Sequence, residues 1–400
     1  MGGKSHTPIP KRNKFMTIAI EPNPAGLYIH IPFCISKCPY CDFYSITDHS
    51  LKKKFVKALL LEMSLYKSVP LIYDTIYIGG GTPSALKSKD IGQIIETVFN
   101  LYKITPDPEI TIEVNPKTVT PGSLKEFKQT GINRINIGVQ SFSDEYLRFL
   151  GRIHSAMEAK EAIAWAKNAG FENLGIDLIY GIPGQTEKSW LFDLKTAIQI
   201  EPDHISCYTL TYEPKTPIYN HMKSGAFSPM PDFLAGSLFE LTSDFLENCG
   251  YIHYEISNFS KGTSKKSRHN LKYWSDAPYI GFGPSAHSFD GTSRSWNVRS
   301  VADYIKTIES GLFPVEEKEV LSKEQQIIEA ILLGLRKKEG ITISNFNIKF
   351  GLIFEEVFKE TISDLKEKKL IALDNNQCRL TKKGTLLLDS ICAMFTLNEF

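Results

Sequence analysis

Between residues 25 and 210, short apolar runs alternate with longer amphipathic stretches. The runs are rich in β-branched and aromatic residues, a composition typical of buried strands. They lie at 27–31, 75–80, 109–114, 134–139, 173–181 and 204–210. The stretches between them have a helical pattern and lie at about 51–67, 90–102, 121–130, 155–169 and 186–199.

Repeated strand–helix units of this kind predict a parallel sheet that is covered by the connecting helices. Six units are too few to close an eight-unit barrel. We therefore expect an α/β fold whose sheet is an incomplete (βα)6 TIM-like barrel. A doubly wound open sheet is the alternative that the same pattern allows.

The alternation loosens after residue 213. A helix is expected over 233–250 and a strand over 251–260, before a segment rich in glycine and aromatic residues. Helices over 322–338 and 353–368 then precede a hairpin with the sequence Asp-Asn-Asn at its turn, which suggests a small winged-helix-like domain. The expected divisions are a flexible lead-in at 1–24, the partial barrel at 25–215, a barrel extension at 216–315 and the winged-helix-like domain at 316–400.

Composition and charge narrow the class of protein. The chain has 400 residues, is 42% hydrophobic and carries a formal net charge of +1, so no overall field favours nucleic acid or a membrane surface. The C-terminal segment has mixed charge, and nucleic acid is not an expected partner. No apolar run is long enough for a membrane span or a signal-peptide core, which predicts a cytoplasmic protein with reduced thiols.

Three of the seven cysteines, Cys34, Cys38 and Cys41, lie within eight residues, directly after the first predicted strand. Thiolates this close can converge on one soft metal centre. Structural zinc normally has four protein ligands, whereas three cysteines on a four-iron cubane leave one iron open to a substrate or cofactor. Incidental cysteines and a three-ligand zinc site are the alternatives.

Polar residues recur where the predicted strands end. A Gly-Gly-Gly-Thr-Pro segment at 79–83 allows a ligand to approach the backbone closely. Glu113 ends an apolar strand, Gln140 ends the next one, and Asp177 lies inside a third, where a carboxylate is costly unless it is paired. Arg152 can offer two parallel donors to a carboxylate. These positions share the edge of the sheet where βα-barrel active sites lie.

The spacing Cys-x3-Cys-x2-Cys, with Tyr40 between the last two cysteines, resembles the signature of the radical S-adenosylmethionine (SAM) superfamily. The resemblance implies a [4Fe–4S] cluster on Cys34, Cys38 and Cys41, whose open iron chelates SAM and delivers an electron that cleaves a C–S bond. The SAM contacts that it implies are Tyr28, Gly80, Gly81, Thr82, Glu113, Gln140, Arg152 and Asp177.

Motifs along 25–400 resemble the oxygen-independent coproporphyrinogen III oxidase-like branch of that superfamily. They include YIHIPFC, GGGTP, IGVQSF, DLIYGIPGQ and GFGPSAHS, in this order. The branch contains the oxidases, which decarboxylate two propionates, and HemW-type haem chaperones, which bind haem and pass it to apoproteins. The oxidases carry a fourth cysteine two residues after the third; Phe43 stands there, which favours the chaperones.

The segment RHNLKYW at 268–274 also resembles a motif of the chaperones. Imidazole ligates haem iron, and aromatic rings stack on a flat macrocycle, so the haem candidates are His269, Tyr273 and Trp274. His287 is a second histidine that the sequence leaves open, and His30 is expected to support the SAM pocket. Basic residues that could meet the propionates are Lys265, Lys266 and Arg268.

The resemblance further implies partners. These are haem as cargo, apo-haemoprotein clients, and a reductant protein such as flavodoxin or ferredoxin, with the chain itself a monomer or weak dimer. An oxygen-independent coproporphyrinogen III oxidase remains the alternative, and a nucleic-acid-modifying radical enzyme is a third class that lacks support from a basic face.

Overall fold

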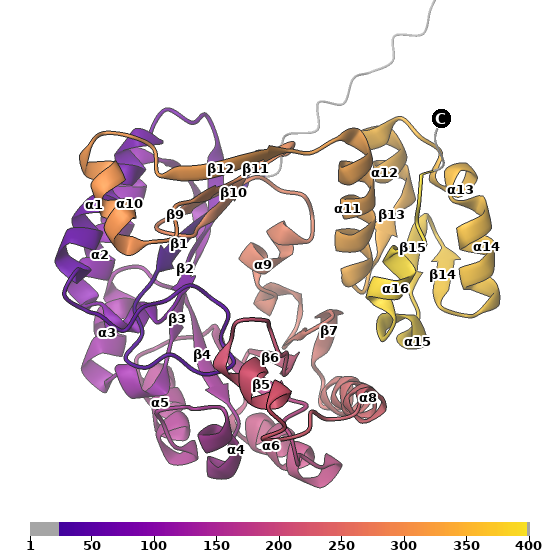
Figure 1. Cartoon of the computed structure of the whole chain (residues 1–400), viewed down its shortest axis with the longest axis horizontal. Coiled ribbons are helices and arrows are strands. Elements are labelled where there is room, and N and C mark those ends of the chain that lie inside the picture. The colour runs from indigo at the N-terminus through magenta and orange to yellow at the C-terminus, as the bar shows by residue number, and fades with distance from the viewer. Residues whose placement is uncertain (1–23, 398–400) are drawn as a thin grey trace, which may run out of the picture.

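The computed structural model describes residues 24–397, and Figure 1 shows their arrangement. The flexible lead-in expected at 1–24 falls, but for its last residue, outside the described residues. A curved sheet of twelve strands forms the larger part of the molecule, and a smaller unit with a three-stranded sheet stands opposite its open face.

Six parallel strands pair in chain order at the centre of the large sheet. They are β1 (Ala25–Ile31), β2 (Ile72–Gly80), β3 (Lys103–Val114), β4 (Arg134–Gln140), β5 (Leu174–Tyr180) and β6 (His204–Thr209). Each corresponds to one of the predicted apolar runs. Because they are parallel and adjacent, their carboxyl ends lie at one edge of the sheet.

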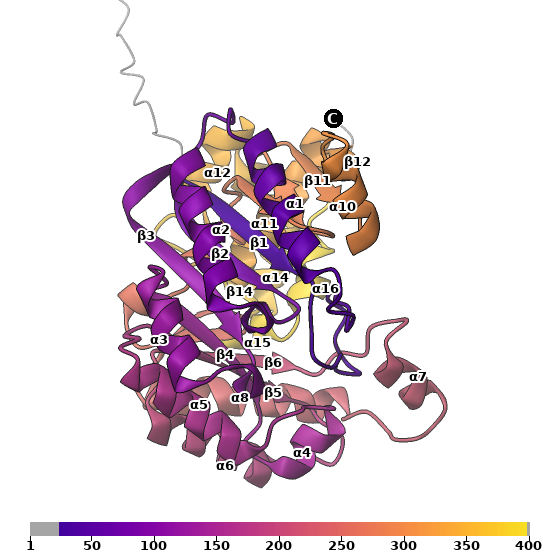
Figure 2. The same cartoon turned by 90° about the vertical axis from the view of Figure 1, so that its left-hand side faces the viewer.

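The connecting helices cover the outer face of this sheet (Figure 2). They are α1 (Lys52–Leu65), α2 (Ser88–Leu101), α3 (Pro121–Gln129), α4 (Asp144–Phe149), α5 (Ala156–Asn168) and α6 (Glu187–Ile200). Capping boxes at Thr120, Ser155 and Thr186 start three of them. Since the crossover helices lie on one face, the fold is the expected incomplete barrel and not a doubly wound sheet.

Both edges of the sheet extend beyond the six predicted strands. The extension next to β1 comprises β9 (Tyr279–Phe282), which is parallel to β1, followed by β10 (His287–Phe289), β11 (Ser293–Asn297) and β12 (Val315–Val320). The opposite edge comprises β8 (Asn258–Ser260) and β7 (Ile252–Glu255).

The single strand predicted over 251–260 is wrong, because the chain reverses there. The Glu255 carboxylate accepts hydrogen bonds from the Ser257 backbone N–H and the Asn258 side chain, which closes a tight turn between β7 and β8. The helices of this middle part of the chain are α7 (Pro217–Lys223), α8 (Asp232–Asn248), α9 (Arg268–Tyr273) and α10 (Val301–Glu309).

Residues after β12 form the smaller unit, which has its own core of phenylalanine, isoleucine and leucine side chains. Its elements are α11 (Lys323–Arg336), β13 (Ile341–Thr342), α12 (Ile343–Phe350), α13 (Phe354–Val357), α14 (Lys359–Glu367), β14 (Ile371–Asp374), β15 (Gln377–Leu380), α15 (Lys382–Thr385) and α16 (Leu388–Cys392). The helix expected over 353–368 is divided at Phe358. The expected hairpin turns through Asn375 and Asn376, both with positive φ.

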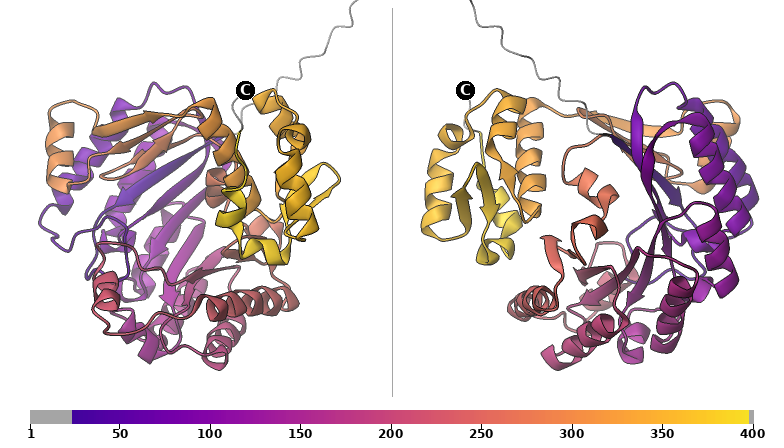
Figure 3. Two further views of the ribbon diagram at one scale, coloured as in Figure 1. Left: turned by 45° about the vertical axis from the view of Figure 1, so that its right-hand side comes forward. Right: turned by 180° about the vertical axis from the view of Figure 1, so that it is seen from behind.

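The domain boundary expected at 315/316 lies inside β12, which pairs with β11 of the large sheet. The smaller unit also contacts the opposite edge of that sheet. There the backbone of Lys337 forms an isolated antiparallel β-bridge with Glu255 of β7, and the Lys338 N–H donates to the Tyr254 carbonyl at 3.1 Å. Helix α9 lies between the sheet and this unit (Figure 3). Its start is fixed by Glu109 of β3, whose carboxylate accepts from the backbone N–H groups of Arg268 and His269.

A buried carboxylate, Glu62 on α1, holds the β9–β10 region against the helical layer. It accepts hydrogen bonds from the Gly283 N–H at 2.8 Å, the Asn297 side-chain amide at 2.7 Å and the Tyr304 hydroxyl at 2.5 Å. Burial raises the pKa of Glu62 to about 7, although these three donors favour its charged form.

We predict that Glu62→Ala lowers the free energy of unfolding by about 3 kcal/mol, because it leaves three buried donors without an acceptor. Urea denaturation of the full chain measures the change. The matched control is Glu96→Ala on the exposed face of α2, which should stay within about 0.5 kcal/mol of the parent. Equal losses in the two variants would show that the buried network contributes nothing specific.

Candidate functional site

The cysteine loop follows β1 at the carboxyl edge of the sheet. Its two ends are tied together, since the Cys34 N–H donates to the Ile46 carbonyl and the Ile46 N–H donates to the Pro32 carbonyl. The His49 ring lies 3.0 Å from the Cys34 carbonyl oxygen. All three cysteines are free thiols; Cys34 is buried, and Cys38 and Cys41 are partly buried. These contacts close the base of the loop that carries Cys38 and Cys41.

Two polar side chains from other loops reach the sulfurs. The Thr82 hydroxyl donates to Cys34 Sγ at 3.5 Å, and Arg152 Nη1 donates to Cys38 Sγ at 3.4 Å. Burial raises the pKa of Cys41 to about 11, so this sulfur needs a cation beside it to become a thiolate. Hydrogen bonds and a guanidinium at these sulfurs favour the thiolate form that a metal centre requires.

The donor set suits an iron–sulfur cubane. Within residues 24–397, no three His, Cys, Asp or Glu side chains converge as ligands of a single metal ion. The three cysteines of a cubane bind three different irons, so their sulfurs need not meet at one point. A Cβ at Gly81 would lie 3.1 Å from Cys34 Sγ and 3.0 Å from two backbone carbonyls, so glycine keeps the space beside this thiol free. Cys34, Cys38 and Cys41 would hold the cluster, which supplies one-electron chemistry when bound.

A buried carboxylate and a glycine segment stand next to the cysteine loop. Glu113 at the end of β3 accepts a hydrogen bond from the Tyr77 hydroxyl at 2.6 Å, and burial raises its pKa to about 7. Gly79 leaves room for this carboxylate, since a Cβ there would lie 3.1 Å from Glu113 Oε2. Gly80 has φ of +110°, and a Cβ there would meet the His30 ring at 2.7 Å. A side chain at either glycine would therefore displace a neighbouring polar group.

The predicted residues from β4, β5 and the following loop lie together. Arg152 Nη2 donates to the Gly138 carbonyl at 2.7 Å, and Asn136 donates to Asp177 Oδ2 at 2.6 Å. Gln140 adopts φ of +70°, a conformation that is rare for residues other than glycine.

One polar atom on each of these three side chains is buried without a hydrogen-bonding partner: Gln140 Oε1, Arg152 Nε and Asp177 Oδ1. Burial also raises the pKa of Asp177. Two acceptors and one donor without partners at one edge of the sheet match the needs of a polar, zwitterionic ligand.

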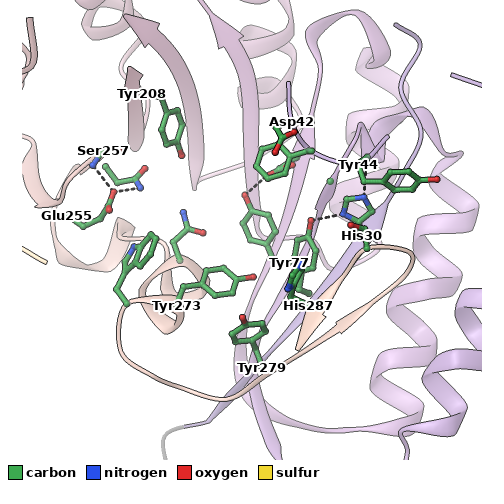
Figure 4. A pocket seen from close by; sticks show the side chains of 18 of the residues that line it. His30, Asp42, Tyr44, Tyr77, Tyr208, Glu255, Ser257, Tyr273, Tyr279 and His287 are labelled. Carbon is green, nitrogen blue, oxygen red and sulfur yellow. Dashed lines mark hydrogen bonds between the residues drawn. The ribbon is translucent and has the colours of Figure 1, made fainter. Parts of the chain in front are cut away.

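A cavity of about 600 Å³ opens beside this edge (Figure 4). Tyrosines form much of its wall, namely Tyr28, Tyr44, Tyr77, Tyr208, Tyr273 and Tyr279. Burial is the main cause that raises the pKa values of Tyr28, Tyr77, Tyr208 and Tyr273, so these phenols remain protonated near neutral pH. The volume falls in the range of small-molecule sites.

The structure separates the three haem candidates. Tyr273 and Trp274 line the cavity, whereas His269 does not. His269 is 1% exposed, and its ring nitrogens lie 2.8 Å from Thr75 Oγ1 and 3.0 Å from the Tyr273 hydroxyl. His269 and Tyr273 lie on the same face of helix α9, as expected. The His269 imidazole points toward Thr75 of β2 and does not line the cavity. Burial lowers the pKa of His269 to about 3, so the ring is neutral.

The basic residues predicted from the same segment lie outside the cavity wall. Lys265 pairs with Asp203, Lys266 pairs with Glu339, and Arg268 donates to the carbonyls of Asp74 and Asp107. The arginines that line the cavity are Arg299 and Arg336, which the sequence did not single out.

Arg336 closes the end of the cavity that faces the smaller unit. Its guanidinium carbon lies 4.3 Å from the centre of the Trp274 ring, and Nη2 lies 3.9 Å from Glu255 Oε2. Arg336 Nε, Trp274 Nε1 and Glu255 Oε2 are each buried without a hydrogen-bonding partner. A carboxylate inside a predicted strand, as at Asp177, was the available signal for Glu255, which the structure places at the end of β7. Nothing local marks Arg336, because α11 reaches the cavity from the other unit.

The sequence and the fold of this chain resemble those of known proteins. The profile of the Radical SAM superfamily matches residues 28–197, and that of the HemN C-terminal domain matches residues 321–387. Among solved structures, coproporphyrinogen III oxidase (HemN) from Escherichia coli superposes with a TM-score of 0.80 at 24% identity, covering 93% of this chain and 90% of that one. At this identity the likeness concerns the fold.

Curated relatives are more similar in sequence. The heme chaperone HemW of Bacillus subtilis is 36% identical over 92% of this chain and 98% of its own length. HemW of Lactococcus lactis is 33% identical over 94% and 98%, respectively. A mitochondrial radical S-adenosyl methionine domain-containing protein 1 of Danio rerio is 31% identical over 95% and 88%.

The partial barrel and its cysteine loop thus define a protein of the radical SAM superfamily, with a C-terminal region of the HemN type. Membership of that superfamily implies a [4Fe–4S] cluster and SAM as cofactors. Within it, the chain belongs to the HemW family. None of the helices between residues 24 and 397 has the length and apolar character of a membrane span.

We predict that Cys38→Ser abolishes the cluster, since two thiolates cannot replace three at a cubane. After anaerobic reconstitution, iron content should fall from about four per chain to near zero, together with the visible charge-transfer absorbance. The control is Cys249→Ser, an exposed cysteine at the end of α8. Full iron content in Cys38→Ser would contradict the ligand assignment.

Proposed function

We propose that this protein is a haem chaperone that carries a [4Fe–4S] cluster and SAM, binds haem in the tyrosine-lined cavity, and transfers it to apo-haemoproteins. The similarity to relatives that are named heme chaperones supports this proposal. The observation that carries it is a roomy aromatic cavity that adjoins the cysteine loop and ends at the smaller unit. A reductant protein such as flavodoxin or ferredoxin, a cytoplasmic location, and a monomer or weak dimer complete the proposal.

For SAM, we assign the polar groups at the carboxyl edge of the sheet. Tyr28, Gly80, Gly81, Thr82, Glu113, Gln140, Arg152 and Asp177 form the proposed binding set. Glycine backbone and carboxylates can receive an ammonium group, and Arg152 can meet a carboxylate. Gln140 Oε1, Arg152 Nε and Asp177 Oδ1 would gain the partners that they lack in the protein alone. A ligand that satisfies them offsets the cost of burying them unpaired.

For haem, the cavity offers a surface suited to a flat, apolar ring with two carboxylates. Tyr273 and Trp274 can contact the macrocycle, and Tyr77 lines the same cavity. Arg299 makes no ion pair with any residue between 24 and 397, and Arg336 has an unpartnered Nε. These two arginines, rather than Lys265, Lys266 and Arg268, are the proposed partners of the propionates.

An oxygen-independent coproporphyrinogen III oxidase is the second candidate, because its fold is shared. Phe43 occupies the position where the oxidases have a fourth cysteine, and its side chain is 69% exposed. This departure, together with the higher identity to the HemW relatives, favours the chaperone.

Glu113→Gln is predicted to weaken SAM binding by about 10- to 100-fold, because a charge-assisted hydrogen bond contributes roughly 1.5–3 kcal/mol. Equilibrium dialysis with cluster-loaded protein measures the dissociation constant. Glu126→Gln, on the exposed side of α3, serves as the control with the same charge change. If both variants bind SAM like the parent, Glu113 does not belong to the site.

Haem uptake and transfer test the proposed function directly. The cluster-loaded chain should bind haem saturably at about one per chain and convert an added apo-haemoprotein to its holo form. With SAM and a reductant, it should yield no protoporphyrinogen IX from coproporphyrinogen III. Conversion of the porphyrinogen would favour the oxidase, and haem binding no tighter than to an unrelated protein would end the chaperone proposal.

A further inference from the structure

Two histidines line the cavity, His30 and His287, and neither belongs to the segment at 268–274. We propose that His287, presented by β10, is the residue that ligates the iron of bound haem, and that His269 positions Tyr273 without touching the iron. The inference rests on the proposed haem-binding function and names the contact that this function requires.

Position within the fold removes most histidines from consideration. Among the histidines of residues 24–397, His30 and His287 line the cavity. Both ring nitrogens of His30 are engaged: Nδ1 lies 3.0 Å from the Tyr28 hydroxyl and Nε2 lies 2.9 Å from the Tyr44 carbonyl oxygen. A ligand to iron needs a free lone pair on one ring nitrogen. His30 would have to give up one of these bonds to bind a metal.

His269 is held even more firmly. Its ring lies behind the cavity wall, stacked on Tyr77 with ring centres 5.0 Å apart, and both nitrogens face hydroxyl groups. To reach a ligand in the cavity, the ring would have to leave Thr75 and pass Tyr273. What the ring does is fix the phenol of Tyr273, which lies edge-on to it at 5.2 Å and reaches the cavity.

His287 has the opposite properties. Its side chain is exposed to the cavity, and its ring makes no hydrogen bond with the residues that the structure describes. The Trp296 ring lies beside it at 5.7 Å and supports one face. Partial burial and the nearby Arg294 guanidinium lower its pKa, so the imidazole is neutral at pH 7 and keeps a lone pair for a metal.

The backbone of His287 is fixed by long-range pairing. Residue 287 pairs with Trp296 on β11, and β9 pairs in parallel with β1, which brings this segment beside Tyr28. A Cβ at Gly281 would meet the His287 carbonyl at 2.2 Å, so only glycine allows the two backbones to approach this closely. Glu62 secures Gly283 in the same loop. A ligand on such a rigid segment can hold an iron in one geometry.

The other possible ligands in the cavity are poorer. The wall tyrosines have raised pKa values, and a protonated phenol is a weak ligand compared with neutral imidazole. Arg299 lies over the Tyr44 ring at 5.5 Å, and the His30 ring is stacked on the same tyrosine with ring centres 6.4 Å apart. It can meet a propionate of a macrocycle whose iron is bound to His287.

The test uses full-length, cluster-loaded protein titrated with ferric haem, with absorbance and electron paramagnetic resonance recorded for each variant. His287→Ala should lose the imidazole-ligated signature and bind haem more than about tenfold more weakly, and added imidazole should restore the signature. His287→Tyr should keep a protein ligand but shift the spectrum to that of a phenolate-bound haem. The control is His221→Ala on α7, outside the cavity wall, which should behave like the parent.

His269→Ala separates the two roles. It should retain the imidazole–iron signature, with weaker binding through the displaced Tyr273. Loss of that signature in His269→Ala but not in His287→Ala would overturn the assignment. Cluster absorbance and SAM binding of each variant verify that it has folded. If the parent chain binds no haem, the proposed function itself fails; if it binds haem and His287→Ala and His287→Tyr match it spectrally, only the present inference fails.

Discussion

The close approach of the glycine segment at the end of β2 to β1 and the loop after β1 is the constraint on which the site depends. Side chains at Gly79, Gly80 and Gly81 would collide with Glu113, the His30 ring and Cys34 Sγ, respectively. His30 lies on β1, Cys34 lies in the loop that follows it, and Glu113 lies at the end of β3, so the glycines between them allow an imidazole, a thiol and a carboxylate to lie around one space. Parallel pairing puts the strand ends at the same height, and the absence of side chains leaves room for ligands between them.

The buried polar groups of the site that lack a hydrogen-bonding partner lie in two separate regions. Gln140, Arg152 and Asp177 form one at the carboxyl edge of the sheet, and Glu255, Trp274 and Arg336 form the other at the contact with the smaller unit. Leaving a buried polar atom unpaired costs about 1–3 kcal/mol, so each region is more stable with a polar ligand group in place. The aromatic cavity connects them, which fits a protein that holds a small polar cofactor and a larger flat cargo side by side.

The smaller unit is part of the site rather than an appendage. Its first helix supplies Arg336, its following residues pair with Tyr254 and Glu255 at the edge of the large sheet, and Lys349 pairs with Asp276 after α9. Helix α9 is thereby held from both sides, since Glu109 fixes its start from the sheet. Movement of this unit would therefore shift Arg336 relative to Trp274 and change the cavity wall.

Local features of the sequence were enough to predict the six parallel strands, five of the helices between them and the Asn-containing hairpin turn, because periodicity depends on residues near in the chain. They did not predict the short helix α4, the pairing of β9 with β1, or the reversal of the chain between β7 and β8. Nor could they tell which histidine faces the cavity: His269 and His287 differ by their packing against β2 and β11, respectively. Only long-range contacts decide which side chains are satisfied within the protein and which remain available to a ligand.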